Sequence, residues 1–275
     1  MKALDGIKVV NLAANLPGPV AAQRLCTMGA EVVKVEAPSG DPMEIYHAGW
    51  YRDMAVGQTL VRLDLKSDQG RVELDRLLGA ADLLISASRP AAMERLGLGW
   101  AALHQKYPRL CQVAIIGFPA PRENEAGHDL TYQASLGLLT PPHMPRTLLA
   151  DMAGAEMTVS SALALLLRRE RGGDPGYAEV ALSEAAASLA EPLRYGCTSP
   201  GAVLGGGIPE YSIYKTSDGW VAVAALEPHF KKRLEDALTI STADQYRSAF
   251  AGQNSAYWQE WGQQQDVPIE TVRDL

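Results

Sequence analysis

The chain has 275 residues, 47% of them hydrophobic and 21% charged, which is the composition of a globular protein with one large domain and a smaller one. A formal net charge of −7 argues against general nucleic-acid binding, because neutralising phosphates requires clustered lysine and arginine. The cysteines are few and far apart, so neither a disulfide framework nor a metal-ligand cluster is expected.

The first part of the chain alternates between predicted strands and helices. Apolar, β-rich runs predict strands at residues 7–13, 30–38, 59–65, 82–88 and 110–118. Helical spacing predicts helices at residues 20–29, 70–80, 91–98 and 101–108, followed by a long helix, a strand and a helix at 155–173, 177–182 and 183–196. This alternation predicts a parallel sheet with helices on both faces, and ligands of such sheets bind beyond the carboxyl ends of the strands.

A composition change marks the end of the large domain. The stretch "CTSPGAVLGGGIPE" is rich in serine, proline and glycine, and the runs "YSIYKT" and "WVAVAAL" around "SDG" after it predict a hairpin. The remainder is predicted to be helical. We expect a large α/β domain over residues 1–198, and a linker with a small α+β domain over residues 199–275.

Several functions lack sequence support. The chain has no G-x-G-x-x-G dinucleotide fingerprint, phosphate loop, H-E-x-x-H metal motif or G-x-S-x-G nucleophile elbow. No apolar run approaches the roughly 20 residues that span a bilayer, and the N-terminus does not resemble a secretory signal. We expect a cytoplasmic protein without metal, nucleic-acid or membrane partners.

Two residues have side chains suited to moving protons. Asp151 lies at the start of the predicted long helix, where it could simply be an N-cap, but the small residues around it would also let a ligand approach the helix end. His128 precedes Asp129 after a glycine, and its near-neutral pKa suits it to proton transfer, although a structural histidine is the simpler interpretation.

Two further residues stand beside predicted helix starts. Arg89 could bind a phosphate or be a solvated arginine. Glu227, in "AALEPHF", could be a functional carboxylate, a surface residue or an N-cap. Taken singly, these residues do not distinguish the alternatives.

The order of several sequence segments along the chain does distinguish these alternatives. The opening "LDGIKVVNLAANLPGPVAAQRLCTMGAEVVKVEAP" is followed by "LDLKSDQG", "SRPAAMERLGLG", "YPRLCQVAIIGF", "AGHDLTY", "LLADMAG" and "YSIYKTSDGWVAVAALEPHF". Together they resemble the family III CoA-transferases, which include the α-methylacyl-CoA racemase branch. The resemblance implies a CoA-binding parallel α/β domain joined to a smaller domain, and coenzyme A as part of the substrate with no other cofactor.

The resemblance leaves two enzymatic functions open. Racemases of this family move the proton α to the thioester with a histidine and an aspartate, at the positions of His128 and Asp151, supported by a glutamate at that of Glu227. Transferases use the aspartate at the position of Asp151 as a nucleophile that forms an acyl anhydride. The "GHD" and "ALEP" segments favour the racemase branch. A third alternative is a non-catalytic acyl-CoA-binding or partner subunit.

Contacts to CoA follow from the same resemblance. We expect Lys66 and Arg89, and also Arg62, to meet the phosphates, and we include Asp129 and Tyr132 among the CoA-binding residues.

The sequence also departs from the family pattern. Ala37 stands where racemases often carry a basic residue, and Gly205, Gly206 and Gly207 could echo the glycine-rich loop of the transferases. The segment from His128 to Asp151 looks shorter than usual. Relatives usually continue beyond "VPIETVRDL" with a segment that returns to the large domain, so we expect a homodimer that separates more readily than theirs.

Overall fold

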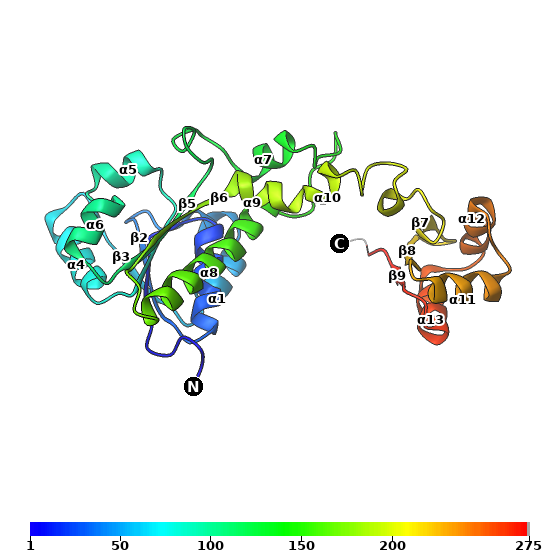
Figure 1. Cartoon of the computed structure of the whole chain (residues 1–275), viewed down its shortest axis with the longest axis horizontal. Helices are drawn as coiled ribbons and strands as arrows, with labels where there is room; N and C mark the ends of the chain where they lie inside the picture. Colours follow the sequence, from blue (N-terminus) through cyan, green and yellow to red (C-terminus); the bar gives the residue numbers. More distant parts are fainter. Residues whose placement is uncertain (274–275) are drawn as a thin grey trace. The chain divides into compact units, whose positions relative to one another are not determined.

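The computed structural model describes residues 1–273 and divides the chain into two compact units, Met1–Ala190 and Glu191–Leu275 (Figure 1). The first unit therefore ends earlier than the boundary expected near Ser199. Residues 274 and 275 of the expected small domain lie outside the described part.

The first unit is built on a parallel six-stranded sheet. Its strands are β1 (Lys8–Asn11), β2 (Glu31–Glu36), β3 (Thr59–Arg62), β4 (Leu83–Ser86), β5 (Cys111–Ile116) and β6 (Tyr177–Ala181), in the order β3-β2-β1-β4-β5-β6. Every residue of β4 and β5 is buried, as both faces of a parallel sheet require. The predicted α/β architecture is confirmed.

Helices cover both faces of this sheet (Figure 1). One face carries α1 (Pro17–Thr27), α3 (Ala48–Ala55) and α8 (Leu149–Glu170), and the other carries α4 (Asp68–Gly79), α5 (Pro90–Arg95) and α6 (Trp100–Lys106). The unit also contains α2 (Pro42–Tyr46), α7 (Asp129–Ser135) and α9 (Leu182–Leu189). The helices α2 and α3 had not been predicted from the sequence.

Local sequence explains where several helices begin. Pro17 opens α1, where a missing N–H is tolerated. Asp41 caps α2 by accepting the N–H of Met43, and Ser67 caps α4 by accepting the N–H of Gly70.

The long helix α8 is the one described helix that is apolar and long enough to cross a bilayer. Half of its apolar window is buried, and it packs against α1, α9 and strands β5 and β6. These are the surroundings of a core helix.

The strand order reverses between β1 and β4. In open α/β sheets, a crevice forms at this reversal beyond the carboxyl ends of the strands. The loops that follow β1 and β4 contain residues 12–16 and 87–89. The fold thus places these loops where a ligand is expected.

The second unit has an antiparallel sheet of β7 (Tyr211–Lys215), β8 (Trp220–Ala224) and β9 (Ile269–Thr271). Its helices are α10 (Glu191–Arg194), η1 (Val203–Gly205), α11 (Pro228–Leu238), α12 (Ala243–Ala251) and α13 (Ser255–Gln265). The predicted hairpin is confirmed. The strand β9 was missed, because three residues are too few to show an alternating pattern.

The glycine-rich loop of this unit has a structural explanation. A Cβ on Gly205 would lie 1.9 Å from the carbonyl oxygen of Ser199, and one on Gly207 would lie 2.1 Å from that of Gly201. Gly206 has a φ of 81°, which favours glycine. Because backbone packing alone requires these glycines, they do not favour the transferase branch.

Candidate active site

A cleft of about 800 Å³ lies in the first unit at the carboxyl ends of the strands. Its walls come from the loops after β1, β4 and β5, from α2, and from the starts of α7 and α8. Four of the predicted site residues line it: Arg89, His128, Tyr132 and Asp151. The sequence-based prediction of a ligand site at this edge therefore coincides with a cleft.

His128 is the N-cap residue of α7, so it lies at the N-terminus of this helix. Its backbone N–H donates to Thr131 Oγ1 at 3.1 Å, and the same hydroxyl donates to the His128 carbonyl at 2.7 Å. The backbone of His128 is thus fixed, while its side chain is exposed along the wall of the cleft. This arrangement leaves the imidazole available to a bound molecule.

Asp129 joins the starts of two helices. Its carboxylate is buried, and Oδ1 accepts the N–H groups of Ala150 at 2.7 Å and Asp151 at 3.2 Å, while Oδ2 accepts from Gln133 Nε2 at 2.6 Å. The residue that caps α8 is therefore Asp129, and Asp151 is not its N-cap, since the helix begins at Leu149. Because both Asp129 oxygens bond within the protein, this side chain supports the site from behind the cleft.

Asp151 lies in the first turn of α8, and it is half-buried. Burial, and to a smaller extent the charge of Asp129, raise the pKa of the Asp151 carboxyl to about 6, with His128 acting in the opposite direction. A carboxyl with this pKa can both accept and return a proton near neutral pH.

Tyr132 is 1% exposed, and its ring packs edge-on against Phe118. Its hydroxyl packs closely against two glycines of the cleft wall. A Cβ on Gly117 would lie 2.6 Å from the hydroxyl oxygen, and a Cβ on Gly127 would lie 2.5 Å from it. Burial, and then the charges of Asp151 and Asp129, raise the pKa of the Tyr132 hydroxyl. It therefore stays protonated at neutral pH.

The other predicted site residues lie elsewhere. Arg62 is exposed on β3 and pairs with Glu44 at 3.2 Å, and the exposed Lys66 lies beyond the end of the same strand. Neither lines the cleft. Glu227 belongs to the second unit, where it is the exposed N-cap residue of α11, so its role in supporting His128 stays a prediction.

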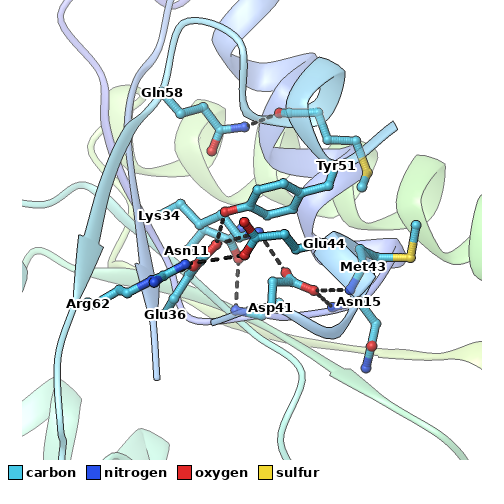
Figure 2. Close-up of polar contacts among 12 residues, drawn as sticks. Asn11, Asn15, Lys34, Glu36, Asp41, Met43, Glu44, Tyr51, Gln58 and Arg62 are labelled. Carbon is cyan, nitrogen blue, oxygen red and sulfur yellow. Dashed lines mark hydrogen bonds and ion pairs between the residues drawn. The ribbon is translucent and has the colours of Figure 1, made fainter. Parts of the chain in front are cut away.

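A buried charge network near the cleft was missed from the sequence (Figure 2). Lys34, on the inner strand β2, is 2% exposed, and its ammonium lies 2.6 Å from Asp41 Oδ2 and 3.1 Å from Glu36 Oε1. Tyr51 donates to Glu36 at 2.7 Å, and burial, followed by this hydrogen bond, raises the pKa of the Tyr51 hydroxyl. The available signal was "EVVKVE", a charged pair with strand spacing inside an apolar run.

This network reaches the wall of the cleft through Asp41. Its Oδ1 accepts the N–H of Asn15 at 3.1 Å and that of Met43 at 2.9 Å, and both residues line the cleft (Figure 2). Asn15 has a φ of 65°, in the left-handed region, so its loop conformation needs such support. Lys34 and Asp41 therefore hold the loop after β1 against α2.

Residues 1–273 contain no cluster of three or more histidine, cysteine, aspartate or glutamate side chains suited to a metal ion.

Proteins with similar sequences are named as racemases and as CoA-transferases. The chain is 33% identical over 259 residues to alpha-methylacyl-CoA racemase of Mus musculus, with 88% of this chain and 66% of the relative covered. It is 30% identical over 260 residues to succinyl-CoA–D-citramalate CoA-transferase of Chloroflexus aurantiacus, with 86% and 64% covered. The chain thus spans about two thirds of the length of these relatives.

A solved structure shares the fold, and a family model matches nearly the whole chain. A hypothetical protein from Mycobacterium tuberculosis superposes with a TM-score of 0.86 at 26% identity, over 99% of this chain and 86% of the other. The model of CoA-transferase family III matches residues 4–275. Together with the parallel sheet, this match identifies the chain as a member of CoA-transferase family III.

Proposed function

We propose that the protein epimerises a 2-methylacyl-CoA by moving the proton α to the thioester. The observation that carries this proposal is the pair His128 and Asp151 in one cleft, the aspartate with a pKa of about 6. An acid and a base in one site are what proton abstraction and return require. Relatives named as alpha-methylacyl-CoA racemases, at 33% identity, support it further.

The reaction would divide into two proton transfers. One of the two side chains takes the α-proton, and the C–H electrons form the double bond of an enolate whose negative charge rests on the thioester oxygen. The other side chain then delivers a proton to the opposite face of the planar carbon. His128 and Asp151 exchange roles for the opposite enantiomer.

In the transferase alternative, Asp151 attacks the thioester carbonyl, CoA leaves as a thiolate, and an acyl anhydride forms. Relatives named as CoA-transferases at about 30% identity favour it. The two reactions differ in the role of His128, because only epimerisation needs its side chain to carry a proton.

The experiment compares the wild type with His128→Ala and Asp151→Asn. Each is incubated with (R)- or (S)-2-methylbutanoyl-CoA in deuterated water, and separately with a free acid as CoA acceptor and hydroxylamine as an anhydride trap. We expect wild-type exchange without an acceptor, and losses of about 10²–10⁴-fold in racemisation for both variants. Residual exchange should favour opposite enantiomers in the two variants, since each retains one proton carrier.

Three results would contradict the proposal. Undiminished racemisation by His128→Ala would remove His128 from the chemistry, and an acyl adduct trapped at Asp151 without α-exchange would establish the transferase. Neither exchange nor transfer by the wild type would indicate a binding module.

We further propose a cytoplasmic protein, as expected from the sequence composition, and a homodimer, as expected from the resemblance. Light scattering at micromolar concentration tests the assembly, and a monomer would contradict it.

A further inference from the structure

The enolate formed in the proposed reaction needs a hydrogen-bond donor at the thioester oxygen. The start of α8 beside Asp151 is the donor that the sequence suggested. In the structure, however, the N–H groups of Ala150 and Asp151 already donate to Asp129. A donor from elsewhere in the cleft would leave these two bonds intact.

The Tyr132 hydroxyl meets the requirements for such a donor. It makes no hydrogen bond with residues 1–273, although the side chain is almost fully buried, and it lies at the wall of the cleft that holds His128 and Asp151. Its oxygen is nevertheless not among the fully buried polar atoms that lack a partner, so the hydroxyl opens on the cleft, where a bound ligand can accept its hydrogen bond.

The surroundings of this hydroxyl fix its position. The ring is held by its edge-on contact with Phe118 and by the α7 backbone, whose N–H at Tyr132 donates to the His128 carbonyl at 3.2 Å. Gly117 and Gly127 leave room at the hydroxyl that any side chain would fill. A donor fixed in advance stabilises developing charge without reorganising during the reaction.

We infer that Tyr132 is a catalytic residue whose hydroxyl donates a hydrogen bond to the thioester oxygen of the acyl-CoA as this oxygen becomes negative. The hydroxyl keeps its proton throughout: the α-proton moves between carbon and His128 or Asp151, and the charge on oxygen returns to carbon when the second proton arrives. This inference rests on the proposed epimerase function.

Tyr132→Phe removes only the hydroxyl and tests the inference directly. We expect kcat for α-deuterium exchange with 2-methylbutanoyl-CoA to fall about 10²-fold, as for loss of one oxyanion donor. The dissociation constant for CoA, measured by calorimetry, should stay within about twofold, because a transition-state contact contributes little to binding. The matched control is Tyr177→Phe, which removes a hydroxyl bonded to Glu179 at the opposite end of the sheet and should leave exchange unchanged.

A second variant separates catalysis from folding. A Cβ on Gly117 would meet the Tyr132 hydroxyl at 2.6 Å but the ring carbon Cζ only at 3.7 Å. Gly117→Ala should therefore slow exchange by displacing the hydroxyl, and should have little further effect in the Tyr132→Phe background, where the clash is gone. If the losses of exchange rate in Gly117→Ala and Tyr132→Phe add up in the double variant, the inference is overturned.

The outcomes distinguish this inference from the proposed function. A wild-type protein without α-exchange contradicts the epimerase. A wild-type protein that exchanges, together with a Tyr132→Phe variant of equal kcat, contradicts the role of Tyr132 alone. A tenfold or greater rise in the CoA dissociation constant with unchanged kcat would also overturn it, because Tyr132 would then be a binding residue only.

Discussion

The carboxylate of Asp129 accepts the backbone N–H of Asp151 at 3.2 Å and, by its charge, disfavours ionisation of the Asp151 side chain. One residue thus holds a proposed proton carrier in place and also contributes to its raised pKa. The two effects can be separated by mutation, because asparagine keeps an acceptor oxygen but loses the charge.

Asp129→Asn should move the pH dependence of exchange. Burial is the larger cause of the raised Asp151 pKa, so the variant should lower this pKa only in part from about 6 toward the ordinary 3.8. The limb of the pH–rate profile in which Asp151 acts as a base should then shift to lower pH. Glu125→Gln, which removes another cleft carboxylate that does not act on Asp151, is the control, and a profile identical to the wild type would contradict the prediction.

Asp151→Asn should stabilise the fold at alkaline pH. The pKa of this carboxyl is raised in the folded state, so folding binds a proton between pH 3.8 and about 6, and stability is lost as the pH rises through this window. Removing the buried charge should increase the free energy of unfolding by up to about 3 kcal/mol near pH 8, and by less near pH 5. Urea unfolding at the two pH values measures the difference. The exposed Asp174→Asn is the control, and an equal effect at both pH values would show that the burial of Asp151 is not responsible.

Arg89→Ala should weaken CoA binding. Arg89 lines the cleft at the start of α5, and a hydrogen bond from a charged group to a phosphate contributes about 1.5–3 kcal/mol. The dissociation constant should therefore rise at least tenfold, equivalent to roughly 1.4 kcal/mol, in calorimetry with CoA. Arg95→Ala changes an arginine at the other end of the same helix and should leave affinity unchanged. Equal affinities for both variants would exclude Arg89 from the site.

Lys34→Met should destabilise the first unit. It leaves the carboxylates of Asp41 and Glu36 buried without their ammonium partner, and breaking a buried pair in this way costs about 3–5 kcal/mol. Lys106→Met breaks an exposed pair with Asp75 and should cost about 1 kcal/mol or less. Chemical unfolding of both variants provides the comparison, and similar losses would show that the Lys34 network has no special importance.

The fold was largely predictable because its signals are local. Buried strands such as β5 read as continuous apolar runs, and glycine and proline mark the loops between them. His128 and Asp151, which line one cleft, could be proposed as site residues because they lie in segments that resemble a known family. The bond from Asp129 to the start of α8 could not, because it joins residues separated by a long connection whose path no local pattern specifies.

The charged residues of β2 show the same limit. Strand spacing indicates that Lys34 and Glu36 face the same side, but their burial depends on Asp41 and Tyr51, which arrive through two helices that the sequence did not reveal. Such partners are set by tertiary packing.

The hydrogen bonds of Asp129 also make the geometry of the site independent of the length of the chain segment that connects α7 to α8. Asp129 joins α7 to α8 directly, and Gln133 Nε2 donates to the carbonyl of Thr147 at 3.2 Å, so both ends of the connection are tied close to the cleft. Residues 139–146 between these ties are mostly exposed. Insertions or deletions there should be neutral for chemistry, so relatives with connections of different lengths can conserve one spacing between the histidine and the aspartate.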